Sequence, residues 1–158
     1  MQISKHFHLK EFVKSQTAIQ HRIGNMPDPS QFNALSALVN RVLEPARVAL
    51  DMPLFVSSGF RSKALNELIG GAHRIENGVY VATSQHCKGE AADLQCKDNA
   101  RLFRYIKENL TFDQLIWEFG DDEQPDWVHV SYTERGLNRF SVLKAVNDNG
   151  KTRYHAFV

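Results

Sequence analysis

The chain has 158 residues, of which 42% are hydrophobic and 23% are charged. These fractions are typical of a soluble globular protein, and no apolar run approaches the roughly 20 residues that a membrane-spanning helix needs. With 19 basic and 18 acidic side chains the formal net charge is +1, which speaks against the broad basic surface of a protein that binds nucleic acid.

The length predicts a single domain over residues 1–158, because a chain of this size buries roughly 68–70% of its unfolded surface. The first seven residues lack the basic start and apolar centre of a secretory signal, so we expect the protein to be cytoplasmic as synthesised. We also expect a monomer. Cys87 and Cys96 are interpreted as reduced, partly buried thiols, although a thiol can in principle be a metal ligand, a nucleophile or half of a disulfide.

Helices are predicted first along the chain. Residues 7–13 carry apolar side chains at helical spacing and predict a short helix. After a proline-rich break, Asp28 or Ser30 can cap a longer helix, which Pro45 either kinks or restarts near its far end. The apolar face of this longer helix predicts core positions at Phe32, Leu35, Leu38, Val39, Val42, Leu43 and Ala46.

The next segments alternate between strands, loops and one helix. Residues 54–56 predict a short buried strand that runs into an arginine-bearing loop, Ser57 to Arg61. Ser62 can cap a helix, which the Gly70-Gly71 pair would end by supplying a residue with positive φ. The Asn77-Gly78 pair predicts a tight turn in an irregular hairpin that borders the cleft.

The second half of the chain is predicted to be rich in strands. A strand over 91–95 is followed by a helix that Asp98 can cap. Further strands are expected over 113–119, 127–133, 140–146 and 152–157, the last two joined around Asn149-Gly150. Helices first and antiparallel strands later indicate an α+β fold, with helices packed on a small antiparallel sheet.

Two separate motifs contain the residues that can bind a metal ion. His86 and Asp93 lie in Ser84-Gln85-His86 and Gly89-x-Ala91-x-Asp93, and His129 follows 36 residues after Asp93. Two imidazoles and a carboxylate can bind one zinc ion. Because three protein ligands leave one coordination position for water, and zinc-bound water can ionise at a pKa of roughly 7, the combination indicates metal-assisted hydrolysis.

Strand alternation adds a further carboxylate. Glu118 lies on the strand side opposite to the apolar Leu115 and Trp117, and His129 lies opposite to its apolar neighbours. If both apolar sides face one core, Glu118 and His129 must project together from the other face. The pattern therefore predicts a carboxylate beside an imidazole.

These motifs resemble those of the zinc D-alanyl-D-alanine peptidases. The resemblance rests on Ser57-Ser58-Gly59-Phe60-Arg61-Ser62, on Ser84-Gln85-His86 with Gly89-x-Ala91-x-Asp93, and on Trp127-Val128-His129. It extends over roughly Leu54 to Ser131. The superfamily includes D-Ala-D-Ala carboxypeptidases, vancomycin-resistance dipeptidases, phage endolysins and the Hedgehog signalling domain, and the chain looks most like its small carboxypeptidase-like M15 members from phages and bacteria.

The resemblance implies specific roles in a Hedgehog/DD-peptidase-like zinc fold. His86, Asp93 and His129 would hold one Zn²⁺ per chain, and Ser84 and Gln85 would line the cleft. Arg61 would bind the carboxylate of the peptide, since a planar guanidinium binds a carboxylate through two hydrogen bonds. A salt bridge that stiffens the loop is the alternative role for Arg61.

The resemblance also implies a function. The expected reaction is hydrolysis of a peptide bond in peptidoglycan or muropeptides, by a D-Ala-D-Ala carboxypeptidase or an endolysin-type endopeptidase, with action in the periplasm or cell wall and a possible phage origin. Several relatives place a glutamate three residues before the last histidine, where this chain has Asp126. Because aspartate is shorter, we favour Glu118 as the general base and keep Asp126 as the alternative.

Two other functional classes remain open at this stage. The chain could be a non-catalytic zinc-stabilised module that binds a peptide or protein, as the Hedgehog relatives suggest. It could also hydrolyse its substrate through the thiol of Cys87.

Overall fold

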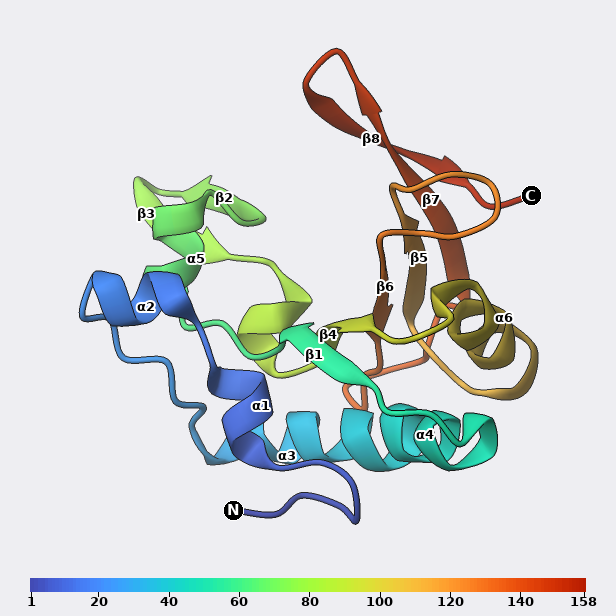
Figure 1. Cartoon of the computed structure of the whole chain (residues 1–158). Helices are drawn as coiled ribbons and strands as arrows, with labels where there is room; N and C mark the ends of the chain where they lie inside the picture. Colours follow the sequence, from blue (N-terminus) through green and yellow to red (C-terminus); the bar gives the residue numbers. More distant parts are fainter.

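A computed structural model describes all 158 residues as an α+β fold, as predicted, with helices covering one face of a six-stranded sheet (Figure 1). None of its helices has the length and apolar composition that a membrane crossing requires. The helical elements are α1 (Leu9–Val13), α2 (Gln16–Gln20), α3 (Pro29–Leu38), the π-helical η1 (Val39–Leu43), α4 (Glu44–Leu50), α5 (Lys63–Ile69), the 3₁₀-helical η2 (Gln85–Lys88) and α6 (Asn99–Asn109). The strands are β1 (Phe55–Ser58), β2 (His73–Glu76), β3 (Val79–Ala82), β4 (Ala91–Gln95), β5 (Gln114–Glu118), β6 (Trp127–Ser131), β7 (Ser141–Asp148) and β8 (Lys151–Ala156).

The longest helical segment begins at a capping box. The side chain of Asp28 accepts a hydrogen bond from the backbone N–H of Gln31, and the side chain of Gln31 accepts one from the N–H of Asp28. α3 continues without a break through η1 into α4. Pro45 lies in the first turn of α4, where the absence of its backbone N–H costs the helix few hydrogen bonds. Pro45 therefore lies where the π-helical η1 gives way to the α-helical α4.

The large sheet has the strand order β1-β4-β6-β5-β7-β8. Its neighbours are antiparallel except for β5 and β7, which run parallel, so the sheet is mixed rather than wholly antiparallel. β6 pairs with one edge of β5. The chain therefore returns after β6 through residues 132–140 and pairs β7 with the free edge of β5.

The edge strand β1 differs from its prediction as a buried strand. Phe55 is 65% exposed, whereas Leu54 is buried and Val56 is half-buried. β1 has a strand neighbour, β4, on one side only, and Phe55 points away from the helices. An apolar run of three residues does not show that its strand lies at an edge.

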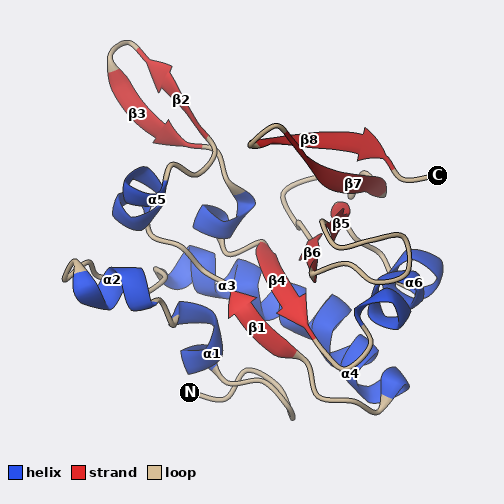
Figure 2. Cartoon of the chain, turned by 45° about the horizontal axis from the view of Figure 1, so that its top comes forward, coloured by secondary structure: helices blue, strands red, loops and turns tan.

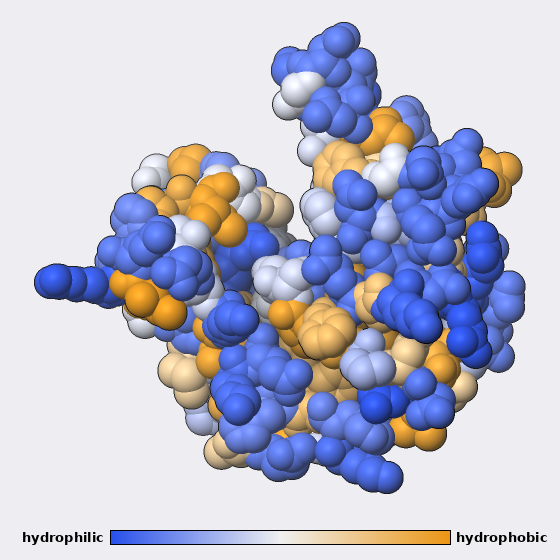
Figure 3. Space-filling model, in the orientation of Figure 1, coloured by the Kyte–Doolittle hydropathy of each residue, from blue (hydrophilic) through white to orange (hydrophobic).

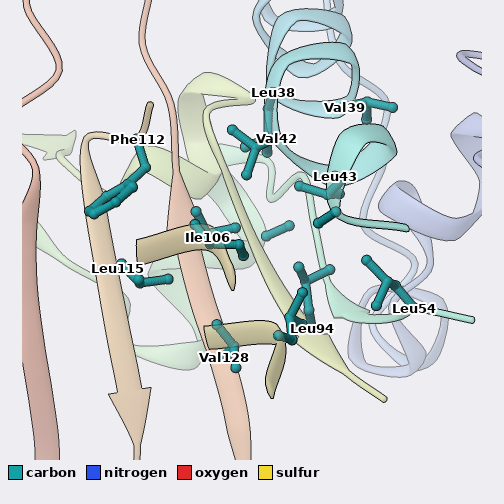
Figure 4. Packing of buried hydrophobic residues seen from close by; sticks show 14 of the residues in the cluster. Leu38, Val39, Val42, Leu43, Leu54, Leu94, Ile106, Phe112, Leu115 and Val128 are labelled. Carbon is teal, nitrogen blue, oxygen red and sulfur yellow. The ribbon is translucent and has the colours of Figure 1, made fainter. Parts of the chain in front are cut away.

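The hydrophobic core lies between the helical layer and the sheet. Leu38 and Val42 from the α3–η1 segment face Leu94, Leu115 and Val128 from the strands (Figure 4). The apolar positions of β5 and β6 predicted for the core are buried, as expected. Because side chains alternate along a strand, the intervening residues of β4, β5 and β6 point away from the helices.

Two hairpins stand on either side of that opposite face (Figures 1 and 2). The β2–β3 hairpin turns at Asn77 and Gly78, with φ values of 51° and 75°, and its strands pair in regular register, which corrects the expectation of an irregular hairpin. The β7–β8 hairpin closes at Asn149-Gly150 as predicted. Between the two hairpins the surface is hollowed (Figure 3).

Candidate metal centre

The hollow is an open cleft of about 1150 Å³. One wall comes from the segments around α5, where Arg61, Ile69 and Ala72 line the cleft, and the other comes from β7 and β8. The β2–β3 hairpin contributes only the residues at its base. His86, Asp93 and His129 all line this cleft.

Those three side chains converge. Asp93 Oδ1 lies 2.8 Å from His129 Nδ1, and Asp93 Oδ2 lies 3.6 Å from His86 Nε2. One ligand atom from each residue lies within 4.8 Å of the other two. The structure thus brings together the two imidazoles and the carboxylate that the sequence motifs singled out.

Sheet pairing and a short helix produce this convergence. Asp93 on β4 is paired in register with His129 on β6, so both side chains leave the sheet on the same face. His86 comes from η2, which ends at Gly89 with φ 76°. A Cβ on Gly89 would lie 2.2 Å from the backbone oxygen of Gln31, so only glycine allows η2 to pack this closely on α3.

The backbone fixes the orientation of the His86 ring. Its Nδ1 lies 2.8 Å from the carbonyl oxygen of Gly59, which can only accept a hydrogen bond, so Nδ1 carries the hydrogen and Nε2 is free toward Asp93. Such a second contact is typical of metal-ligating histidines. A Cβ on Gly59 would lie 2.7 Å from the backbone of Phe12, so this glycine lets α1 pack behind the site.

The protonation states suit a metal ion. Burial disfavours the charge on Asp93, but hydrogen bonds with His129 and His86 outweigh it and hold the pKa of Asp93 well below its usual range. Burial, partly offset by Asp93, lowers the pKa of His129. A carboxylate and neutral imidazoles are the forms that bind metal. One donor atom from each residue lies within 4.8 Å of the other two, and imidazole nitrogen and carboxylate oxygen are both ligands of zinc, so this donor set fits zinc.

The two candidate bases occupy different environments. Glu118 lines the cleft and is only 7% exposed, and its side chain makes no hydrogen bond or ion pair with the protein. Burial, with a further contribution from the charge of Asp93, raises the pKa of Glu118 to about 7. Asp126 is exposed and lies outside the residues that line the cleft. Of the two carboxylates, the structure places Glu118 beside the metal-binding cluster.

Arg61 lines the cleft without an acidic partner. Its guanidinium donates to the Oδ1 of Asn66 over 3.1 Å, and it takes part in no ion pair, so the predicted alternative of a stiffening salt bridge is not observed. Asn66 is fully buried and also donates to the carbonyl of Ala72 and the hydroxyl of Tyr80. Asn66 therefore sets the position of Arg61, a role that no sequence pattern indicated.

The two residues before His86 both line the cleft. The hydroxyl of Ser84 accepts a hydrogen bond from the backbone N–H of His86 over 3.3 Å. The amide of Gln85 donates to Asp113 over 3.0 Å and to Glu90 over 3.4 Å. Gln85 thus joins η2, which carries His86, to two buried carboxylates.

Two arginines hold those carboxylates, and we call these pairs the arginine clamps. Arg135 binds Glu90 through two hydrogen bonds of 2.6 and 2.9 Å, and Arg139 binds Asp113 through two of 2.9 and 2.8 Å. Burial opposes the charge on Glu90, but Arg135 and Thr133 outweigh it and lower the pKa of Glu90. Arg139 likewise lowers the pKa of Asp113. The clamps could not be predicted from the sequence, because their partners come from loops far apart in the chain.

The cysteines lie apart from this chemistry. Cys87 is buried, does not line the cleft, and has its pKa raised by burial. The segment that carries it is 3₁₀-helical rather than extended. Cys96 is a second free thiol, and neither joins the metal-binding cluster.

Comparison with known proteins agrees with this geometry. A family model for peptidase M15 matches residues 5–131, which run from before α1 to the end of β6 and include all three metal-binding candidates. No curated protein matches the chain significantly. Because the match covers most of the chain, the protein belongs to the M15 family of zinc-dependent peptidases.

Proposed function

We propose that the protein hydrolyses a peptide bond in peptidoglycan stem peptides, with one zinc ion held by His86, Asp93 and His129. One observation carries this proposal. Three metal-binding side chains and an unpaired buried carboxylate, Glu118, line the same open cleft. The family supports a zinc peptidase, and the cell-wall substrate is our inference from the motifs and the cleft.

When held by three protein ligands, zinc would lower the pKa of a bound water and polarise the carbonyl group of the peptide. Glu118 is the general base in this proposal. It takes a proton from the attacking water and returns it to the leaving amine. Glu118 lines the same cleft as the metal-binding candidates and has no partner in the protein, so its carboxylate is free to make both transfers. Asp126, the alternative base, does not line the cleft, which favours Glu118 for this role.

Arg61 is proposed to bind a carboxylate of the substrate. Its guanidinium lines the cleft, has no acidic partner and is held from behind by Asn66, so it can form two hydrogen bonds with an incoming carboxylate. Stem peptides carry such a group at their free end. Ser84 adds a hydroxyl to the same cleft, and Gln85 positions η2 through its contacts with Asp113 and Glu90.

The alternative of a non-catalytic zinc module is less well supported. Zinc sites with a purely structural role are usually closed by four protein ligands, whereas three converge here. A buried carboxylate without a partner also disfavours folding, so a module that needs zinc only for stability has no use for Glu118 at this position. Thiol hydrolysis is not supported, because Cys87 does not line the cleft.

Incubation with defined muropeptides tests the proposal. We expect the zinc-loaded protein to release D-alanine or to cut within the stem peptide, and the product masses will distinguish these outcomes. A chelator should abolish the reaction and added zinc should restore it. His86→Ala should lose the metal, measured by elemental analysis, and lose the activity with it. Turnover that survives metal removal, or a wild-type protein with one bound zinc that cleaves no muropeptide, contradicts the proposal.

A further inference from the structure

One wall of the cleft lies outside the matched family region. The family match ends at Ser131, whereas the β7–β8 hairpin follows it in the chain. β7 pairs with β5, the strand that carries Glu118, and β8 pairs with β7. The hairpin therefore extends the metal-bearing face of the sheet with residues that the shared motifs do not include.

Tyr154 on β8 lies in the same row of the sheet as Glu118. Glu118 is paired with Ala145, and Ala145 is paired with Tyr154. Paired residues of neighbouring strands share a face of the sheet, so both side chains stand on the metal-bearing face. Their backbones are two strand spacings apart, about 9.6 Å. Ala145 between them carries only a methyl group, which leaves room for the tyrosine ring to lean toward Glu118.

The cleft lining confirms which side of β8 faces the metal-binding cluster. Thr152 and Tyr154 line the cleft together with Glu118 and Asp93, whereas Arg153 and His155 do not. Tyr154 is half-exposed, and its hydroxyl has no hydrogen-bond partner in the protein. A phenol on this wall is therefore free to donate to a molecule bound in the cleft.

The surroundings keep that phenol protonated. Burial raises the pKa of Tyr154, and the negative charges of Glu118 and Asp93 raise it further. Since even an ordinary tyrosine has a pKa of about 10, the hydroxyl carries its hydrogen at neutral pH. Arg61 lines the same cleft from the side of α5, so a bound peptide would lie between a cationic group and a neutral hydrogen-bond donor.

We propose that Tyr154 is a catalytic residue whose hydroxyl donates a hydrogen bond to the carbonyl oxygen of the scissile peptide. The bond strengthens as negative charge develops on that oxygen in the transition state. This proposal rests on the hydrolytic function proposed above and adds to it a residue that the family motifs do not contain.

Tyr154→Phe removes the hydroxyl and keeps the ring. With the muropeptide that the wild-type protein cleaves, we expect kcat to fall about 10- to 100-fold with little change in KM. Loss of an enclosed oxyanion donor costs about 10²–10³ in kcat, and the half-exposed position of Tyr154 makes its effect smaller. Tyr105→Phe is the matched control, because Tyr105 packs against the core and does not line the cleft.

A binding measurement provides a readout that does not depend on turnover. Calorimetry with zinc-loaded protein should show that Tyr154→Phe weakens binding of a dipeptide phosphinate, which mimics the tetrahedral transition state, by about tenfold or more. Binding of the product peptide should be unchanged. An active wild-type protein and a Tyr154→Phe variant with equal kcat and equal phosphinate affinity overturn the role of Tyr154 alone. A wild-type protein that cleaves no muropeptide overturns both proposals.

Discussion

Glu118 and Glu90 are both buried glutamates near the cleft, and their environments are opposite. Glu90 is 1% exposed and accepts hydrogen bonds from Arg135 and Thr133, and these contacts outweigh burial and lower its pKa. Glu118 is 7% exposed, has no partner and has a pKa of about 7. Burial alone therefore does not identify a catalytic carboxylate. The absence of a compensating donor is the feature that distinguishes Glu118, the proposed general base, from Glu90.

The difference follows from the position of each residue in the fold. Glu90 lies between η2 and the loop over residues 133–140, where a fixed charge pair can hold two segments together. Glu118 points from the sheet into the cleft, where solvent and substrate are its only possible partners. The arginine clamps thus hold Glu90 and Asp113 in fixed pairs, whereas the carboxylate of Glu118 remains without a partner in the cleft.

Replacement of Glu118 has the largest expected effect and tests its proposed role as the general base. Glu118→Gln should lower kcat about 10²- to 10⁴-fold, the range that general acid–base catalysis contributes, while the protein retains one zinc per chain. Muropeptide kinetics and elemental analysis measure these quantities. Asp126→Asn is the matched control and should keep wild-type turnover. The opposite pattern, with Asp126→Asn inactive and Glu118→Gln active, would show that the base has been assigned wrongly.

Replacement of Arg135 tests the proposed structural role of Glu90. Arg135→Ala leaves the Glu90 carboxylate buried without its main partner and should reduce the free energy of unfolding by about 3 kcal/mol, at the low end of the range for broken buried pairs because Arg135 itself is largely exposed. Urea unfolding measures the loss. Arg153→Ala breaks a pair in which both partners are exposed and should cost less than about 1 kcal/mol. If both variants lost the same free energy of unfolding, the buried clamp would contribute no more to stability than the exposed pair.

The pH dependence of stability should also distinguish Glu118 from Glu90, although the expected effect is smaller. Glu118 ionises near pH 4.5 in the unfolded chain and near pH 7 in the fold, so the metal-free protein should lose stability as pH rises through this window. Glu90 has the opposite sign, and its contribution is lost as pH falls below 4.5. Metal-free Glu118→Gln should exceed the wild-type stability at pH 8 by on the order of 2 kcal/mol and match it at pH 4. If the free energy of unfolding of the variant changed with pH in the same way as that of the wild type, Glu118 would not be desolvated in the fold.

Local chemistry made most of the secondary structure predictable. Asp28, Ser62 and Asp98 each cap the helix that they were expected to begin, because a capping hydrogen bond joins residues only three positions apart. Alternation along β5 and β6 likewise placed Glu118 on the face of His129. The metal-binding cluster could be inferred because His86, Asp93 and His129 lie in sequence motifs that, taken together, resemble those of the zinc D-alanyl-D-alanine peptidases.

Features that depend on distant parts of the chain were not predictable. The parallel pairing of β5 with β7, the edge position of Phe55 and the arginine clamps all depend on which segments become neighbours. Tyr154 reaches the cleft only because two successive strand pairings carry it there. No periodicity within one segment contains that information.

The β7–β8 hairpin is joined to the rest of the sheet on one side only. It attaches along a single strand, β5, and none of the three metal-binding candidates belongs to it. Substitutions on this hairpin can therefore alter which peptides are accepted while the ion-binding residues stay in place. Grafting a hairpin of different length or charge after residue 140, with a tyrosine kept at the position of Tyr154, would be a direct route to engineering a new preference.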